Sequence, residues 1–174
     1  DSGMKKLALT DFAKYRYPSA LELSPDSRYL TFALKDVDRE GDGYRWNLWL
    51  YDLERRESRQ ITQGDDQRKA VWEDNTHILY KTTEPDEALR ARGFEEEWTV
   101  YHRLNVCTGE DREAFRLPMS VSGLWKMDEG RYVFTGETHL DRPNLLELTG
   151  EALEKELVRR QQTKGYKVLT ELPL

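Results

Sequence analysis

Apolar and polar residues alternate along this chain in short runs that end at turn-forming residues. Residues 20–23 and 28–32 each place an apolar side chain at every second position, and Ser-Pro-Asp-Ser lies between the two runs. Proline presets the backbone at the second position of a turn, and an aspartate beside it can hydrogen-bond to the nearby main chain. Alternation with a period of two buries one face of a strand. The pattern therefore predicts an antiparallel hairpin.

A second hairpin follows and completes a four-stranded unit. Its strands are residues 47–53 and 58–62, and the polar residues 54–57 join them. The same order of strands and turns then recurs twice, the second time more loosely. The predicted strands of the later units are residues 70–72, 76–80, 98–106 and 114–117, then 123–125, 131–135 and 144–151, the last with its turn included.

The turn aspartates Asp26, Asp74 and Asp128 measure this repeat. They are 48 and 54 residues apart, a period typical of repeat architectures. Four-stranded sheets that bury their faces against neighbouring sheets are the blades of a β-propeller. We therefore expect an all-β fold, namely a partial β-propeller of about three four-stranded antiparallel blades. Because propellers usually have about four to eight blades, the ring would be incomplete.

One short helix is expected near the C-terminus. Residues 151–162 place Leu153, Leu157 and Val158 at helical spacing among charged residues, and Gly165 lies beyond them. An apolar stripe of this width predicts an amphipathic helix with one buried side.

The chain is expected to divide into a lead-in segment and a series of blades. Residues 35–45 and 83–97 interrupt the strand pattern, and we expect charged loops there. The predicted divisions are a lead-in segment 1–16 and a partial β-propeller 17–174, with blades at about 17–66, 67–118 and 119–165 and the start of a further blade at 166–174.

Composition and charge argue against several classes of partner. Charged residues make up 34% of the chain with both signs mixed and a net charge of −6, so we expect no nucleic-acid partner. No apolar run approaches the roughly 18 residues of a membrane span, so we expect a soluble chain with no membrane partner. The single cysteine, Cys107, cannot form an intrachain disulfide and is typical of the reducing cytoplasm.

Several short motifs together carry a family resemblance. They are residues 24–32 (SPDSRYLTF), 48–53 (LWLYDL) and 60–62 (QIT), with 9–12 (LTDF) as the lead-in and 165–173 as the passage into a further blade. This set resembles the prolyl oligopeptidase family of serine peptidases, on its acylaminoacyl-peptidase and dipeptidyl-aminopeptidase side. The resemblance implies a propeller that caps an α/β-hydrolase domain of the same parent chain and selects peptide substrates for it. A glycine is usual in the family's hairpin turn where this chain has Arg55 and Arg56, which leaves the turn type open.

The catalytic residues of that family have no counterpart in this sequence. The family's Ser-Asp-His triad lies in its carboxy-terminal domain, and the G-x-S-x-G motif around the nucleophile has no match here. The nearest sequence, at residues 120–123, lacks the first glycine. We therefore predict no catalytic residue and no cofactor in this chain, and a parent that is a serine-type peptidase.

A run of three glutamates, residues 95–97, is the candidate binding site. It resembles the cluster by which dipeptidyl peptidases of this family hold the free amino terminus of a substrate, and the resemblance implies Glu95 and Glu96 as substrate-binding residues. Paired carboxylates suit an ammonium group, because opposite charges attract most strongly where water is partly excluded. The alternative is a solvated acidic stretch that leads into a strand.

Histidines and tryptophans offer two further candidate sites, each with a structural alternative. His77, His102 and His139 are far apart and lack the spacing of metal ligands, so we predict no metal site. The tryptophans could form a platform for carbohydrate or pack between blades. The matching repeat positions of Trp72 and Trp125 favour packing. The five tryptophans are Trp46, Trp49, Trp72, Trp98 and Trp125.

Two functions remain open for the chain. The first is a non-catalytic propeller segment that gates and selects peptides for a serine peptidase. The second is a TolB-like or WD-repeat-like propeller scaffold that binds protein partners. An α/β-hydrolase pattern downstream in the parent would favour the peptidase. In either case an open arc of blades exposes apolar faces, so we expect the chain to self-associate.

Overall fold

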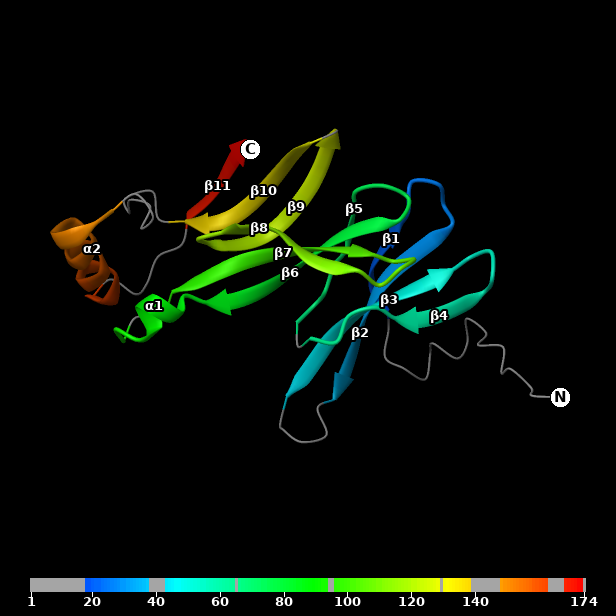
Figure 1. Ribbon diagram of the computed structural model, residues 1–174, viewed down its shortest axis with the longest axis horizontal. Helices are drawn as coiled ribbons and strands as arrows, with labels where there is room; N and C mark the ends of the chain where they lie inside the picture. Colours follow the sequence, from blue (N-terminus) through cyan, green and yellow to red (C-terminus); the bar gives the residue numbers. More distant parts are fainter. Residues whose placement is uncertain are drawn as a thin grey trace. The chain divides into compact units, whose positions relative to one another are not determined.

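The computed structural model describes residues 18–37, 43–64, 66–93, 96–128, 130–138, 148–162 and 168–173 (Figure 1). It is mostly β, with antiparallel sheets and two helices, which confirms the predicted fold class at that level. The chain divides into two compact units, each considered by itself below. The first unit is Asp1–Thr82 with His102–Ala114, and the second is Thr83–Tyr101 with Phe115–Leu174.

The first sheet is a four-stranded antiparallel meander in the first unit. Pairing between its two central strands runs without interruption from Tyr29 opposite Asp52 to Val37 opposite Tyr44. The strands lie side by side in chain order, as the two predicted hairpins require. They are β1 (Ser19–Leu23), β2 (Tyr29–Val37), β3 (Tyr44–Asp52) and β4 (Glu57–Gln60).

The second sheet repeats the same strand order and spans parts of both units. Its four strands confirm the second predicted meander. Helix α1 lies in the stretch 83–97, where the sequence predicted only a charged loop. Asp86 begins this helix by accepting a hydrogen bond from the backbone of Leu89 at 3.1 Å. The elements are β5 (Val71–Trp72), β6 (His77–Pro85), α1 (Glu87–Arg90), β7 (Glu97–Asn105) and β8 (Asp111–Leu117).

The third sheet lies in the second unit and has three strands among the described residues. Residues 168–173 pair with the middle strand of this sheet, whereas the sequence placed them at the start of a further blade. Most of the expected third strand, residues 144–147, lies outside the described residues. The predicted helix over 151–162 is confirmed. The elements are β9 (Ser120–Asp128), β10 (Arg131–Thr138), α2 (Gly150–Gln162) and β11 (Val168–Pro173), with sheet order β11-β10-β9.

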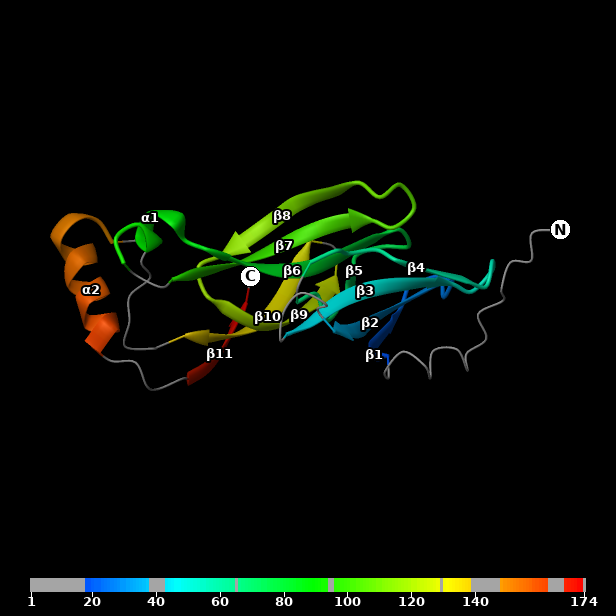
Figure 2. The ribbon, with the colours of Figure 1, turned by 90° about the horizontal axis from the view of Figure 1, so that it is seen from below.

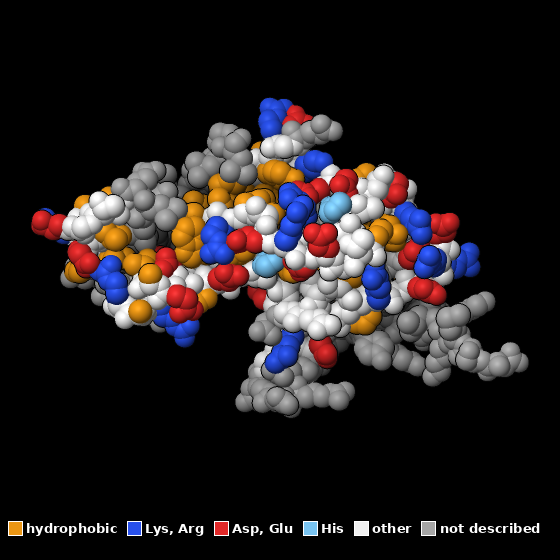
Figure 3. All heavy atoms as spheres, viewed as in Figure 1, with side chains coloured by type: hydrophobic (Ala, Val, Ile, Leu, Met, Phe, Trp, Pro, Cys, Tyr) orange, Lys and Arg blue, Asp and Glu red, His pale blue; other side chains and the backbone are white. Residues whose placement is uncertain are grey.

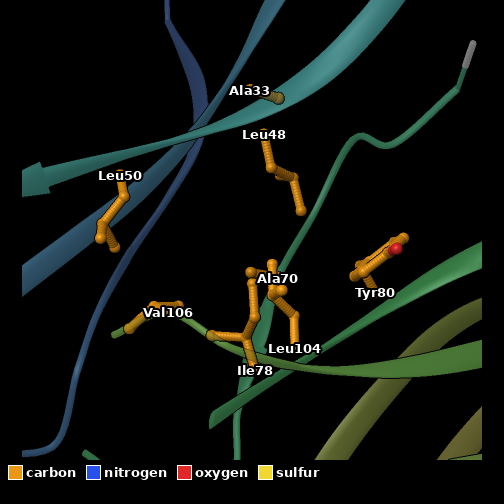
Figure 4. Close-up of a cluster of buried hydrophobic side chains, with 8 residues drawn as sticks. All are labelled: Ala33, Leu48, Leu50, Ala70, Ile78, Tyr80, Leu104 and Val106. Atoms are coloured by element: carbon orange, nitrogen blue, oxygen red, sulfur yellow. The ribbon is translucent and has the colours of Figure 1, made fainter. Parts of the chain in front are cut away.

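A single apolar core joins the first sheet to the part of the second sheet in the same unit. In Figure 4, side chains of β2 and β3 point toward side chains of β6, β7 and the segment before β5. Removing such side chains from water contributes about 25 cal/mol per Å² of apolar surface, so face-to-face stacking stabilises this unit. The core residues are Ala33, Leu48, Leu50, Ala70, Ile78, Tyr80, Leu104 and Val106.

The turns between third and fourth strands are the same in the first two sheets. Asp52 Oδ1 accepts hydrogen bonds from the backbone N–H groups two and three residues later, and Asn105 Oδ1 does the same. Arg56 and Gly109 then follow with φ of 56° and 78°. Arg56 therefore adopts the left-handed backbone that favours glycine, which answers the question that the sequence left open.

The two longest connections each follow the second strand of a sheet and contain a helix. Residues 86–96 connect β6 to β7 and contain α1, while residues 139–167 connect β10 to β11 and contain α2. Both views of the second unit show α1 and α2 side by side (Figures 1 and 2). Neither α1 nor α2 has the length and apolar character to cross a membrane, and these are the helices of the described residues.

Candidate functional site

A hollow of about 230 Å³ lies in the second unit, where α1, α2 and the start of β7 meet. Glu96, one of the two predicted substrate-binding residues, lines it. Glu95, the other, lies outside the described residues. We call this feature the acidic hollow, and its lining residues are Asp86, Ala88, Leu89, Arg92, Glu96, Glu97, Trp98, Pro118 and Leu153.

Asp86 organises one side of the acidic hollow. Its Oδ1 caps α1, and its Oδ2 accepts a hydrogen bond from the indole Nε1 of Trp98 at 3.0 Å. The backbone N–H of Asp86 donates to the carbonyl oxygen of Glu96 at 2.8 Å. One aspartate therefore fixes the helix, the tryptophan ring and the backbone that carries Glu96. An aspartate directly before Glu-Ala-Leu-Arg is a sequence signal for a helix start, so this role could have been predicted.

The wall of the acidic hollow is apolar. Leu89 is buried, and Trp98 and Leu153 are half-buried. The guanidinium of Arg116 lies 5.7 Å from the centre of the Trp98 ring and forms an ion pair with Glu84 at 3.5 Å. These contacts hold the indole in place as a flat apolar surface next to the acids.

The charges at the acidic hollow favour a cation. Its lining includes the carboxylates of Asp86, Glu96 and Glu97 and one guanidinium, that of Arg92. Arg92 forms an ion pair with Glu154 of α2. An ammonium group attached to an apolar side chain would find both carboxylates and the apolar Leu89 and Trp98 among the lining residues. The arrangement can therefore bind such a group, but it offers no nucleophile among its lining residues.

A second polar cluster lies in the first unit and was not predicted. His102 Nδ1 lies 3.1 Å from Asp111 Oδ1, and its Nε2 lies 3.3 Å from Thr82 Oγ1. The Tyr80 hydroxyl donates to the other oxygen of Asp111, and the Tyr80 and His102 rings stack at 5.2 Å. Burial, together with the bond to Asp111, raises the pKa of Tyr80. The four residues come from the neighbouring strands β6, β7 and β8. We therefore interpret the cluster as a set of side-chain contacts that stabilises the pairing of these strands.

The histidines have carboxylate neighbours and form no metal-binding group within the described ranges. His77 Nδ1 lies 3.0 Å from Asp74 Oδ2, and His102 faces Asp111 as above. Among the described residues, no three His, Cys, Asp or Glu side chains gather as metal ligands would. His139 lies outside the described residues.

The tryptophans divide between packing and exposure. Trp72 stacks on Tyr29 with ring centres 6.3 Å apart, and its indole donates to the Glu22 carbonyl at 3.2 Å. This agrees with the packing role expected for Trp72. Trp125 is 46% exposed, and the packing role expected for it stays a prediction. The surface in Figure 3 shows acidic and basic side chains mixed over the visible face, as the composition indicates.

Known proteins add no family assignment to this geometry. No protein-family model matches the chain, and no curated protein matches it. The resemblance to prolyl oligopeptidase blades therefore rests on the motifs in the sequence itself. The function that this resemblance implies can be tested at the acidic hollow.

Proposed function

We propose that this chain is a non-catalytic β-propeller segment of a serine peptidase similar to the dipeptidyl and acylaminoacyl peptidases. It would gate and select peptides for an α/β-hydrolase domain of the same parent polypeptide. Its free thiol, Cys107, fits a cytoplasmic enzyme. The nucleophile would come from the parent, since no residue of this chain matches the family's catalytic motif.

The repeated meander is the observation that carries the proposal. The first two sheets have the same strand order and the same turn at Asp52 and Asn105. In the first unit their facing side chains share one core. Modular sheets that bury their faces against each other are what a propeller requires. The closed ring and the neighbouring hydrolase domain are parts of the proposal.

The acidic hollow gives the proposed gate a chemical preference. A peptide with a free amino terminus would place its ammonium group near Glu96 and its first side chain against Leu89 and Trp98. Hydrogen bonds to charged groups contribute about 1.5–3 kcal/mol, so loss of one is measurable as a change in affinity. We propose Glu95 as a second carboxylate for the same ammonium.

A scaffold that binds protein partners is the second candidate function. Trp125 is 46% exposed and Met127 is 65% exposed, and they lie two residues apart on β9. Exposed aromatic and Met side chains are enriched at protein interfaces. The same surface would also allow self-association, which light scattering at increasing concentration would detect as a rising mean mass.

Calorimetric titration tests the proposed selection of free amino termini. The probes are a leucine-containing dipeptide amide and its N-acetyl form, which lacks the positive charge. We expect the free amine to bind at least tenfold more tightly, and Glu96→Gln to remove most of this difference. Glu110→Gln, a change of an exposed turn residue outside the hollow, should leave both affinities unchanged. Equal affinity for the two probes would refute the role of the hollow.

The reading frame of the parent separates the two candidate functions. An α/β-hydrolase pattern with G-x-S-x-G after this segment is expected for the peptidase. A parent without it would favour the scaffold.

A further inference from the structure

Few of the described side chains of helix α2 are buried. Of its described side chains, only Glu156 and Leu157 are buried, while Leu153 is half-buried and Val158 is 47% exposed. Glu156 forms an ion pair with Arg159 of the same helix at 3.0 Å. Segments with few buried apolar contacts open locally at lower free energy than strands in a core.

The side of α2 that carries Leu153 and Glu154 contacts the acidic hollow. Leu153 lines the hollow itself. Glu154, the next residue, forms an ion pair with Arg92, which follows α1 and also lines the hollow. Leu153 and Arg92 are distant in sequence, but both belong to the second unit. One wall of the hollow is therefore a helix that the structure joins to it through Leu153 and the Arg92–Glu154 ion pair, with Leu157 as its fully buried apolar side chain.

We propose that helix α2, which forms one wall of the acidic hollow, separates from it by local opening. The Arg92–Glu154 ion pair, called the clasp below, holds the helix in the closed position. The inference rests on the proposed function for its ligand, but the clasp itself belongs to the free protein. Opening of α2 would remove Leu153 from the apolar wall and widen the entrance to the hollow.

The clasp also holds a positive charge that would otherwise compete with the ammonium group of a ligand. Arg92 is the guanidinium that lines the hollow together with Asp86, Glu96 and Glu97. In the structure the guanidinium of Arg92 is paired with the carboxylate of Glu154, which offsets its positive charge. When this ion pair breaks, the Arg92 guanidinium can approach the carboxylates of the hollow and compete with the ammonium group of a ligand. Glu154 is therefore a positioning residue that acts on the ligand through Arg92.

Amide hydrogen exchange of the full chain without ligand tests the clasp. An exposed ion pair contributes up to about 1 kcal/mol, so Arg92→Gln or Glu154→Gln should speed exchange over residues 153–158 by about two- to fivefold. The double variant should exchange no faster than either single variant, because both changes break one contact. Glu151→Gln, which removes an ion pair with Lys155 inside the helix, is the matched control. Rates that multiply in the double variant, or equal those of the control, would overturn the proposal.

Titration with the dipeptide amide then tests the effect on the ligand. Glu154→Gln should weaken binding about three- to tenfold, and adding Arg92→Gln should restore it, because the competing charge is gone. A further loss in the double variant would contradict the proposed competition. If the native chain does not bind the probe, the proposed function fails, and the exchange rates alone then decide whether the clasp exists.

Discussion

The two kinds of connection in this molecule differ in what they do. The short turns after β3 and β7 repeat one set of hydrogen bonds, with Asp52 and Asn105 in the same place. The connections after β6 and β10 are longer, and each contains a helix. The repeated turns join the third and fourth strands of a meander, whereas the longer connections supply most of the residues that line the acidic hollow. Fold and site therefore depend on different residues and can be changed separately.

The largest expected effect comes from the apolar core of the first unit. Leu48 has no exposed surface and lies in the core shared by the first two sheets. Leu48→Ala should lower the free energy of unfolding by about 3 kcal/mol, since it leaves a cavity as well as losing buried apolar surface. Leu53→Ala, at an exposed position, should cost about 0.5 kcal/mol or less. Urea denaturation measures both, and equal costs would contradict the core described here.

Substitutions at the equivalent turn residues Arg56 and Gly109 should change the free energy of unfolding by smaller amounts and in opposite directions. Arg56 has a φ of 56° and Gly109 a φ of 78° in equivalent turns. Arg56→Gly should raise the free energy of unfolding by about 1 kcal/mol, because glycine adopts this backbone without strain. Gly109→Ala should lower the free energy of unfolding by about 1 kcal/mol, because alanine is strained at this positive φ. A steric clash is not the cause, since the added Cβ would meet no atom within 4 Å. A stability change of the same sign in both variants would mean that the turns are not equivalent.

The smallest effect concerns the pH dependence of the first turn. A hydrogen bond from Ser24, followed by one from the backbone of Arg28, lowers the pKa of Asp26 below its ordinary value. The stability from this group is therefore present above the ordinary pKa and is lost as the pH falls through the lower folded value. We expect a carbon-detected titration to place the Asp26 midpoint below that of an ordinary aspartate and Ser24→Ala to move it upward. An unchanged midpoint in the variant would refute this cause.

The sequence was sufficient for the meanders because the information for them is local. Alternation and turn residues around Asp26 and Asp52 predicted the strands of the first sheet, and the same signals predicted the second. Strand β11 was assigned to a further blade, since its partner β10 lies some thirty residues earlier and helix α2 comes between them in the chain. Long-range pairing of this kind is not encoded in a local period.

The site was predictable in part. The acidic run indicated Glu96, but the hollow also needs Leu153 and Arg92, which only the packing of α2 beside α1 brings together. The cluster of Tyr80, His102 and Asp111 depends on the register of three strands, so no spacing in the sequence reveals it. The sequence left the turn type at Arg56 open, because glycine is the residue that adopts a left-handed backbone most readily and arginine gives no such signal.

Amide hydrogen exchange, measured over the whole chain, compares the central strands of the first two sheets with the helices of the long connections most directly. We predict that amides in the centres of β2, β3, β6 and β7 exchange slowest, near the global free energy of unfolding, and that α1 and α2 exchange at least tenfold faster. Protection of α2 equal to that of β3 would contradict the account, because the hollow would then belong to the same rigid core as the stacked sheets.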